Sequence, residues 1–246
     1  MTTQSIDKRG NGALNLLGGL LKLAYCLRRH LWGAWSLAHW LALLLGAAAI
    51  VVLVRSWPSF GAALLLGVLL VSWIVFLRWA GRKGYVHYRV GSDADMMLSN
   101  APPRPPMRPE KLVPVQATGW FTVEGTDQYL VDVEADMKIT GLGERIVMGR
   151  LHPSRFLLLG RWPSYELGWW YIFFFPAHIQ EISAGHMSFG LRSRVALRLI
   201  YGLDGEPRQT IYLTSGEAWV LRLVRDDLQR ELSFMERKAS TGSRTP

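Results

Sequence analysis

HLWGAWSLAHWLALLLGAAAIVVLV (residues 30–54) and SWPSFGAALLLGVLLVSWIVFL (residues 56–77) are the two long apolar stretches of the chain, and only Arg55 separates them. Each is long enough to cross a hydrocarbon core about 30 Å thick, which takes roughly 20 helical residues. Pro58 interrupts the helix between them, because proline has no backbone N–H and clashes with the preceding turn. The sequence therefore predicts a transmembrane helical hairpin in residues 31–80, with spans at about 34–54 and 59–79.

The net charge of +9 comes from the flanks of these stretches, since acidic and basic side chains cancel from residue 90 onward. This distribution removes the main support for nucleic-acid binding. The basic residues interpreted as membrane-flanking are Arg28, Arg29, Arg78, Arg82 and Lys83. Because Lys and Arg are enriched in cytoplasmic loops, we expect a multi-pass protein of the plasma or inner membrane with both termini in the cytoplasm.

Residues 1–30 contain a shorter apolar run, ALNLLGGLLKLAYCL (13–27), which Lys22 and a pair of glycines interrupt. The run falls short of bilayer thickness. We therefore expect an interfacial segment that lies along the cytoplasmic leaflet, with a third span as the alternative.

The region 90–114 is expected to be a linker, because its part APPRPPMRPEKLVP (101–114) holds six of the twelve prolines. Proline-rich chain is extended and semi-rigid, so this spacer would separate the membrane anchor from a folded module. The alternative is that the prolines are a ligand for an aromatic-grooved domain.

Residues 115–237 show the pattern of successive β-hairpins, with turn signals around Gly125 and around Pro153 and a clear strand pair within 195–213. Thr214 and Glu217 form a capping-box pattern, and apolar residues then recur every three or four positions, which predicts one amphipathic helix. We expect the remaining residues, 238–246, to be a disordered tail.

The block LGWWYIFFF (167–175) is apolar enough to suggest another span, but it is half the necessary length and Pro176 closes it. Its aromatic and β-branched content favours a core strand. The tryptophans here exceed what the interior of a small barrel needs, so we assign a partner surface to Trp162, Trp169, Trp170 and Tyr171.

This order of strands, followed by the step Pro176, Ile179 and Ile182 and by one C-terminal helix, resembles bacterial pleckstrin-homology-like proteins that carry an N-terminal transmembrane hairpin. The resemblance covers roughly residues 115–235 and rests on hydrophobic patterns. It implies an antiparallel β-barrel or sandwich capped by the helix, within an α+β membrane protein. The long proline-rich segment and the unusually aromatic strand depart from the family pattern.

No catalytic motif is present: the sequence has no phosphate-binding glycine loop, nucleophile elbow or HExxH pattern. None of the six histidines lies at metal-ligand spacing from a cysteine or carboxylate, and Cys26 is the single cysteine. We therefore expect no enzyme, metal or cofactor. His39, inside the first span, is interpreted as a neutral hydrogen-bonded side chain, with a haem or pigment ligand as the alternative.

The sequence thus favours a non-enzymatic, membrane-anchored adaptor or scaffold that presents a cytoplasmic module to a protein partner, with a homo-oligomer through the hairpin as a further option. One alternative is an accessory subunit of a larger membrane complex for transport or energy conversion. Another is a module that binds anionic lipid headgroups through Arg192 and Arg194, which the resemblance suggests.

Overall fold

The computed structural model describes residues 6–29, 31–32, 35–55, 60–103, 112–123, 126–138, 145–150, 169–174, 178–202 and 208–242. The chain divides into two compact units. The first contains Met1–His87 and the short segment Phe189–Arg192, and the second contains most of the chain from Tyr88 onward. Each unit is built around its own set of elements.

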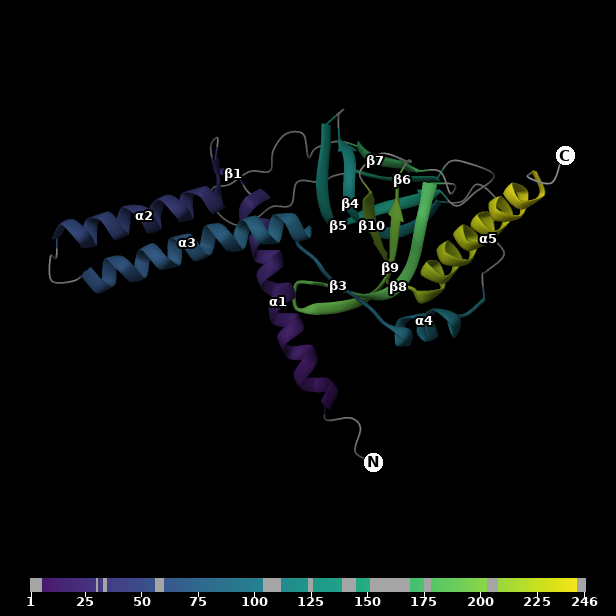
Figure 1. The fold of residues 1–246 in the computed structure, drawn as a ribbon, viewed down its shortest axis with the longest axis horizontal. Helices are drawn as coiled ribbons and strands as arrows, with labels where there is room; N and C mark the ends of the chain where they lie inside the picture. Colours follow the sequence, from purple (N-terminus) through teal and green to yellow (C-terminus); the bar gives the residue numbers. More distant parts are fainter. Residues whose placement is uncertain are drawn as a thin grey trace. The chain divides into compact units, whose positions relative to one another are not determined.

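The first unit is helical (Figure 1). Its helices are α1 (Ile6–Arg29), α2 (Leu37–Arg55) and α3 (Phe60–Lys83). Two short strands, β1 (Leu31–Trp32) and β2 (Trp35–Ser36), pair with each other antiparallel between α1 and α2. Helices α2 and α3 lie side by side as a hairpin, as predicted.

Two stretches of this hairpin, Leu37–Arg55 and Leu64–Lys83, are long and apolar enough to cross a membrane. Only 6% of each apolar stretch is buried within the protein, so their leucines and valines face outward. Such extensive apolar exposure has a large free-energy cost in water and suits a lipid environment. These helices therefore point to membrane insertion, and α3 continues four residues beyond the predicted end at 79.

The second unit is built on an eight-stranded sheet. Its strands are β3 (His87–Val90), β4 (Leu112–Val123), β5 (Thr126–Lys138), β6 (Arg145–Arg150), β7 (Trp169–Phe174), β8 (Ile179–Phe189), β9 (Arg192–Tyr201) and β10 (Gln209–Thr214). They follow the order β3-β8-β9-β10-β4-β5-β6-β7, and β4 also pairs with β7. Strands β4 to β7 thereby form a closed ring of antiparallel pairs.

Two of the predicted hairpins are confirmed, while the turn expected around Pro153 lies outside the described residues. Strands β4 and β5 flank the expected turn near Gly125, and β9 and β10 form the later pair. The aromatic block contributes β7, which pairs along its length with β6, so Trp169–Phe174 form a strand and not a membrane span. The α+β class is therefore confirmed.

Two helices complete the second unit: α4 (Ser92–Ser99) and α5 (Ala218–Gly242). Helix α5 packs its apolar stripe on the sheet, because Val220, Leu221, Val224 and Leu228 share one buried cluster with residues of β4, β5, β9 and β10. Helix α4 adds Ala94 and Leu98 to the same core. Among the described residues, this core contains no side chain of α1, α2 or α3.

Some boundaries differ from the sequence patterns. Helix α5 begins at Ala218, four residues after the capping pattern predicted, because Thr214 is the last residue of β10 and fully buried. The expected linker 90–114 includes α4, while 104–111 lie outside the described residues. Helix α5 also extends to Gly242, into the expected tail, and 243–246 are outside the described part.

Candidate functional site

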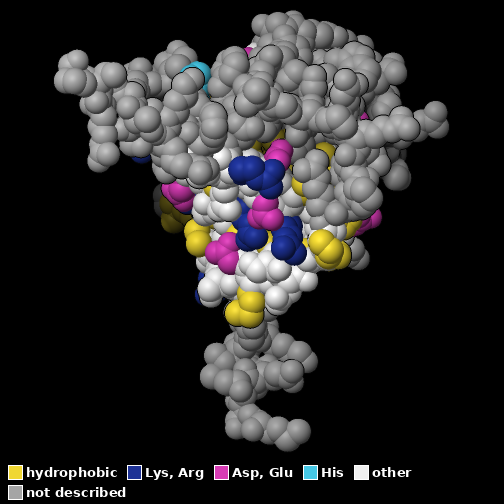
Figure 2. All heavy atoms as spheres, turned by 90° about the vertical axis from the view of Figure 1, so that its right-hand side faces the viewer, with side chains coloured by type: hydrophobic (Ala, Val, Ile, Leu, Met, Phe, Trp, Pro, Cys, Tyr) yellow, Lys and Arg dark blue, Asp and Glu magenta, His cyan; other side chains and the backbone are white. Residues whose placement is uncertain are grey.

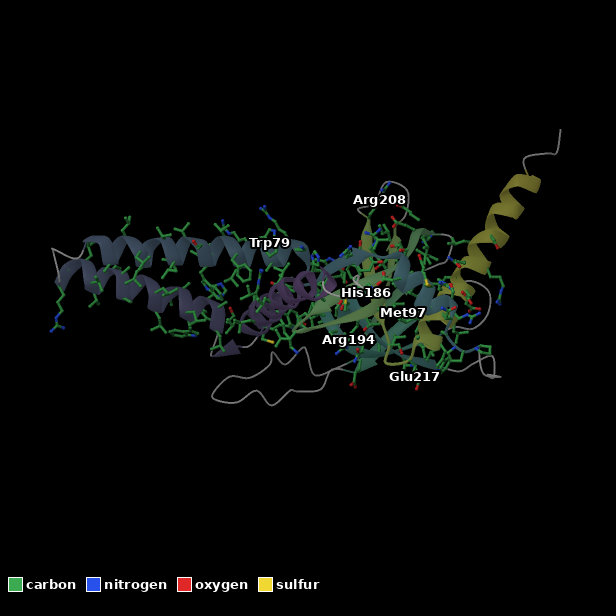
Figure 3. The ribbon with its side chains drawn as sticks, turned by 90° about the horizontal axis from the view of Figure 1, so that it is seen from below. Trp79, Met97, His186, Arg194, Arg208 and Glu217 are labelled. Atoms are coloured by element: carbon green, nitrogen blue, oxygen red, sulfur yellow. The ribbon has the colours of Figure 1, made fainter. Side chains whose placement is uncertain are left out.

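Arg194, one of the two predicted headgroup ligands, lies on β9 and is held by neighbouring strands. Its Nη1 donates to Asp132 Oδ1 at 3.1 Å and also to the side-chain oxygen of Gln116. The Arg194 side chain is 39% exposed and is labelled in Figure 3. For Arg192, the structure describes only the backbone, which begins β9. A shared ligand site of the two arginines therefore stays a prediction.

The partner of Arg194 depends on a β-bulge between β4 and β5. The register shifts between Ala117 and Gly119, so that β5 has one extra residue there. Asp132 adopts a positive φ of 52°, which aspartate tolerates better than most residues, and its N–H donates to Thr118 Oγ1 at 2.8 Å. The bulge thus directs the Asp132 carboxylate to the face that carries Arg194.

The predicted partner surface is only partly described. Trp162 lies outside the described residues. Trp169, Trp170 and Tyr171 are the first residues of β7, opposite Arg150, Gly149 and Met148 of β6. Their side chains are outside the described part of the structure. Their role as a partner surface stays a prediction.

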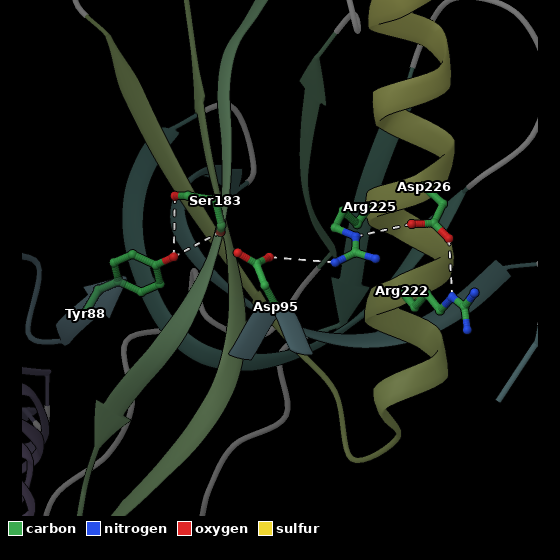
Figure 4. A network of polar contacts seen from close by, with 6 residues as sticks. All are labelled: Tyr88, Asp95, Ser183, Arg222, Arg225 and Asp226. Atoms are coloured by element: carbon green, nitrogen blue, oxygen red, sulfur yellow. Dashed lines mark hydrogen bonds and ion pairs between the residues drawn. The ribbon is translucent and has the colours of Figure 1, made fainter. Parts of the chain in front are cut away.

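A charged network joins α4 to α5 (Figure 4). Arg225 Nη1 lies 3.7 Å from Asp95 Oδ1, and its Nε donates to Asp226 Oδ1 at 3.2 Å. Asp226 also pairs with Arg222 at 3.4 Å, and Arg222 donates to the backbone oxygen of Ala101. The side chain of Arg225 is only 14% exposed. These contacts fix the orientation of α4 against the C-terminal helix.

Apolar side chains lie exposed beside this network. Met96 and Met97 of α4 are 63% and 54% exposed, and Val90 before the helix is also exposed. Figure 3 labels Met97, and Figure 2 shows basic and acidic side chains gathered with apolar ones at their margin on the side that carries α5. Methionine side chains are flexible and polarizable, so they adapt to varied binding partners. We call Met96, Met97, Arg222, Arg225 and Asp226 the α4–α5 surface.

A hydrogen bond to β8 fixes the beginning of α4. His186 Nε2 of β8 lies 2.9 Å from Asp93 Oδ2. The hydrogen bond to His186 is the main reason why the pKa of the Asp93 carboxyl lies below its ordinary value. The Asp93 side chain remains largely exposed, and its contact with His186 could not be predicted from local patterns because the two residues are 93 positions apart.

A third cluster lies on the sheet between β3, β8, β9 and β10. Tyr88 donates to the Ser183 backbone oxygen at 2.9 Å, and its ring lies under the Arg198 guanidinium at 5.2 Å. Arg198 also donates to Ser183 Oγ at 3.0 Å and pairs with Glu181. Burial raises the pKa of Tyr88 above its ordinary value, although the bond to Ser183 acts in the opposite direction. This cluster connects the edge strand β3 to the sheet.

The membrane-flanking arginines and lysines lie at the ends of α1 and α3. Arg28 Nη1 donates to Tyr85 Oη at 2.9 Å, and Arg29 lies 5.5 Å from the centre of the Tyr25 ring. Lys83 Nζ lies 5.0 Å from the ring of Trp79, an arrangement typical of a membrane boundary. Arg28 thus joins the end of α1 to the end of α3, and the membrane-flanking role of these basic residues stays a prediction.

His39 lies in the first turn of α2, where Ser36 Oγ is 2.6 Å from its Nδ1. This contact is to a residue three positions earlier and not to the neighbouring helix. Among the described residues, no group of three or more His, Cys, Asp or Glu is placed to hold a metal ion.

Comparison with known proteins gives no relative. No family model, curated protein or solved structure is significantly similar to the chain.

The α4–α5 surface was missed by sequence reasoning. Asp95 and Arg225 are far apart along the chain, and α4 is too short for a strong periodic signal. The one available signal was the adjacent pair Met96 and Met97 in a helix whose apolar residues exceed what one buried face needs.

Proposed function

We propose that the chain is a non-enzymatic, membrane-anchored adaptor whose second unit binds a cytoplasmic protein through the α4–α5 surface. The observation that carries this proposal is the pair of exposed methionines beside a network of partly buried charges. Adaptable apolar side chains on an element that charged groups hold in place combine binding area with specificity. The exposed apolar helices α2 and α3 supply the membrane anchor.

Two further features support this proposal over lipid binding by the second unit. Arg194 is already paired with Asp132 and Gln116, so part of its hydrogen-bonding capacity is used. The charges of the chain from residue 90 onward cancel, so the second unit carries no excess of positive charge to attract an anionic lipid surface.

The test is a pull-down of the full-length chain from detergent-extracted native membranes, with identification of the bound protein. The variant Met96→Gln/Met97→Gln keeps good helix formers and removes the apolar contact. We expect it to lose the partner that the unmodified chain retains. The matched control is Leu191→Gln, which replaces another exposed apolar residue, 67% exposed, in the first unit. Equal partner recovery by the double variant and the unmodified chain would contradict the proposal.

A second candidate is an accessory subunit that contacts a larger membrane complex through its hairpin. The observation that favours it is Gly67 of α3, where an added Cβ would meet no atom within 4 Å. A small residue on an outward-facing helix lets another helix approach closely in lipid. Gly67→Leu should then release the chain from the complex while the double methionine variant remains bound. The opposite result supports the adaptor.

A further inference from the structure

Helix α1 has an apolar face that the protein leaves uncovered. Leu16, Leu20 and Leu23 are 67%, 51% and 50% exposed. They recur at spacings of four and three, so they form one stripe along the helix, and Leu27 continues it. Such a stripe on a water-soluble surface would carry an unfavourable free energy, so it needs a covering apolar phase.

The other sides of α1 are occupied within the first unit. Gly18 O accepts a hydrogen bond from Gly190 N at 2.9 Å, and Lys22 Nζ lies 5.4 Å from the centre of the Phe189 ring. Tyr25 packs edge-on against Phe189 and Tyr85. At 100° per residue, these contacts lie across the helix from the leucine stripe. These contacts therefore fix the rotation of α1 about its own axis, so that the leucine stripe faces away from Phe189 and Tyr85.

Helix α1 also lies at the end of the hairpin where the basic residues gather. The bond from Arg28 to Tyr85 and the close approach of Arg28 to Gly81 place its C-terminal turn beside the end of α3. Figure 1 shows α1 crossing the direction of α2 and α3. A helix that crosses two spans at their basic end runs along the membrane surface instead of through the bilayer.

The charge of α1 fits a lipid surface as well. Residues 16–29 contain Lys22, Arg28 and Arg29 and no acidic residue. Cationic side chains beside an apolar stripe are the pattern of helices that lie in the interface of anionic membranes. Burial raises the pKa of the Cys26 thiol at the border of the stripe, as expected for a group away from water.

We propose that α1 is a third membrane contact: it lies in the cytoplasmic leaflet with Leu16, Leu20, Leu23 and Leu27 in the acyl boundary and with Arg28 and Arg29, in its last turn, at anionic headgroups. The occupant of the stripe is the lipid bilayer that holds α2 and α3, because the contact between Arg28 and Tyr85 keeps α1 at the end of α3 and the exposed apolar helices require that bilayer. This placement would hold the helix, and the segment Phe189–Arg192 bound to it, close to the membrane surface.

Fluorophore depth in liposomes tests this proposal with the full-length chain. In a Cys26→Ser background, a bimane label is placed at Leu20→Cys, and the matched control carries it at Lys22→Cys on the opposite side of α1. The liposomes contain phosphatidylglycerol, phosphatidylethanolamine and lipids with nitroxide quenchers at defined depths. We expect the label at position 20 to lie about 5–10 Å into the boundary between headgroups and acyl chains. The label at position 22 should be quenched by acrylamide in the water phase.

Three results would overturn the proposal. Acrylamide quenching at position 20 as strong as at position 22 would place the stripe in water. Strongest quenching by nitroxides at the bilayer centre would make α1 a third span. Protection of the bimane at position 20 from both quencher types, together with excimer emission from a parallel sample labelled there with pyrene, would identify a second copy of this chain as the occupant. Because the hairpin anchors every variant, these outcomes are independent of the partner of the second unit.

Discussion

At the scale of single residues, Asp132 shows how one backbone conformation sets a polar contact. Its positive φ places the extra residue of the bulge so that the carboxylate meets Arg194 on β9. A β-branched residue is strained in this left-handed region, whereas asparagine tolerates it. Substitutions at Asp132 can therefore distinguish the free-energy cost of an unsuitable backbone conformation from the contribution of the ion pair to stability.

We expect Asp132→Val to destabilise the protein by roughly 1–2 kcal/mol through backbone strain, in addition to the loss of the ion pair. Asp132→Asn should cost less, about 1 kcal/mol or below, because the Arg194 pair is partly exposed and screened. Thermal unfolding of the detergent-solubilised chain, followed by circular dichroism of the sheet, measures the difference. Equal destabilisation by both variants would mean that the ion pair, and not the backbone, dominates.

The pair of Asp93 and His186 predicts a pH dependence. The folded-state pKa of Asp93 lies below its ordinary value of 3.8. Its contribution to stability is therefore present above that ordinary value and is lost as the pH falls through the lower, folded-state pKa. In His186→Ala, the midpoint of the Asp93 carboxyl titration should rise toward the ordinary value. Carbonyl-carbon NMR measures the midpoint, and an unchanged value in the variant would show that the hydrogen bond is not its cause.

At the scale of elements, the structure depends on close backbone approaches that only glycine permits. An added Cβ at Gly185 of β8 would lie 2.2 Å from the backbone oxygen of Arg89 on β3. Backbone atoms cannot move aside as a flexible side chain can. The absence of a side chain at this position is thus what allows β3 to join the edge of the sheet.

Gly185→Ala should accordingly detach β3 while the rest of the sheet remains folded. Hydrogen exchange at residues 88–90 measures this, and we expect fast exchange there with unchanged protection in β4 and β10. Gly216→Ala is the control, because an added Cβ there meets no atom within 4 Å. Unchanged protection of β3 in Gly185→Ala would indicate that the two strands can separate slightly without losing their pairing.

At the scale of the whole molecule, the chain consists of an apolar helical unit and a unit with its own core. The basic residues that flank α3 predict that the segment after α3 is cytoplasmic and that the turn near Trp57 is on the other side. The two exposed helices give this prediction its physical basis, because lipid must cover them.

Labelling from each side of the membrane tests this topology. In a Cys26→Ser background, a membrane-impermeant maleimide should react with Ser99→Cys only in inverted vesicles and with Trp57→Cys only in right-side-out vesicles. Ser99 is suitable because it is exposed at the end of α4. Reaction of Ser99→Cys in right-side-out vesicles would show that the orientation is opposite to the proposed one. The proposal of a cytoplasmic partner would then be wrong.

Local patterns predicted most of the elements and little of the candidate site. Apolar length predicted α2 and α3, and the paired strand patterns predicted β4, β5, β9 and β10. The three- and four-residue spacing predicted α5 but placed its beginning too early, since Thr214 continues the sheet. The meeting of Asp95 with Arg225 could not be predicted, because it depends on where two distant segments pack.

The sequence by itself determined the type of each long element, because span length and apolar periodicity are properties of consecutive residues. Only the tertiary structure decided that β4 pairs with β7 and that Asp132 forms an ion pair with Arg194. It also decided that the leucine stripe is the exposed side of α1. These features arise from contacts between residues far apart in the chain. The free energy of such contacts depends on how the whole chain packs, so it cannot be derived from a short stretch of sequence.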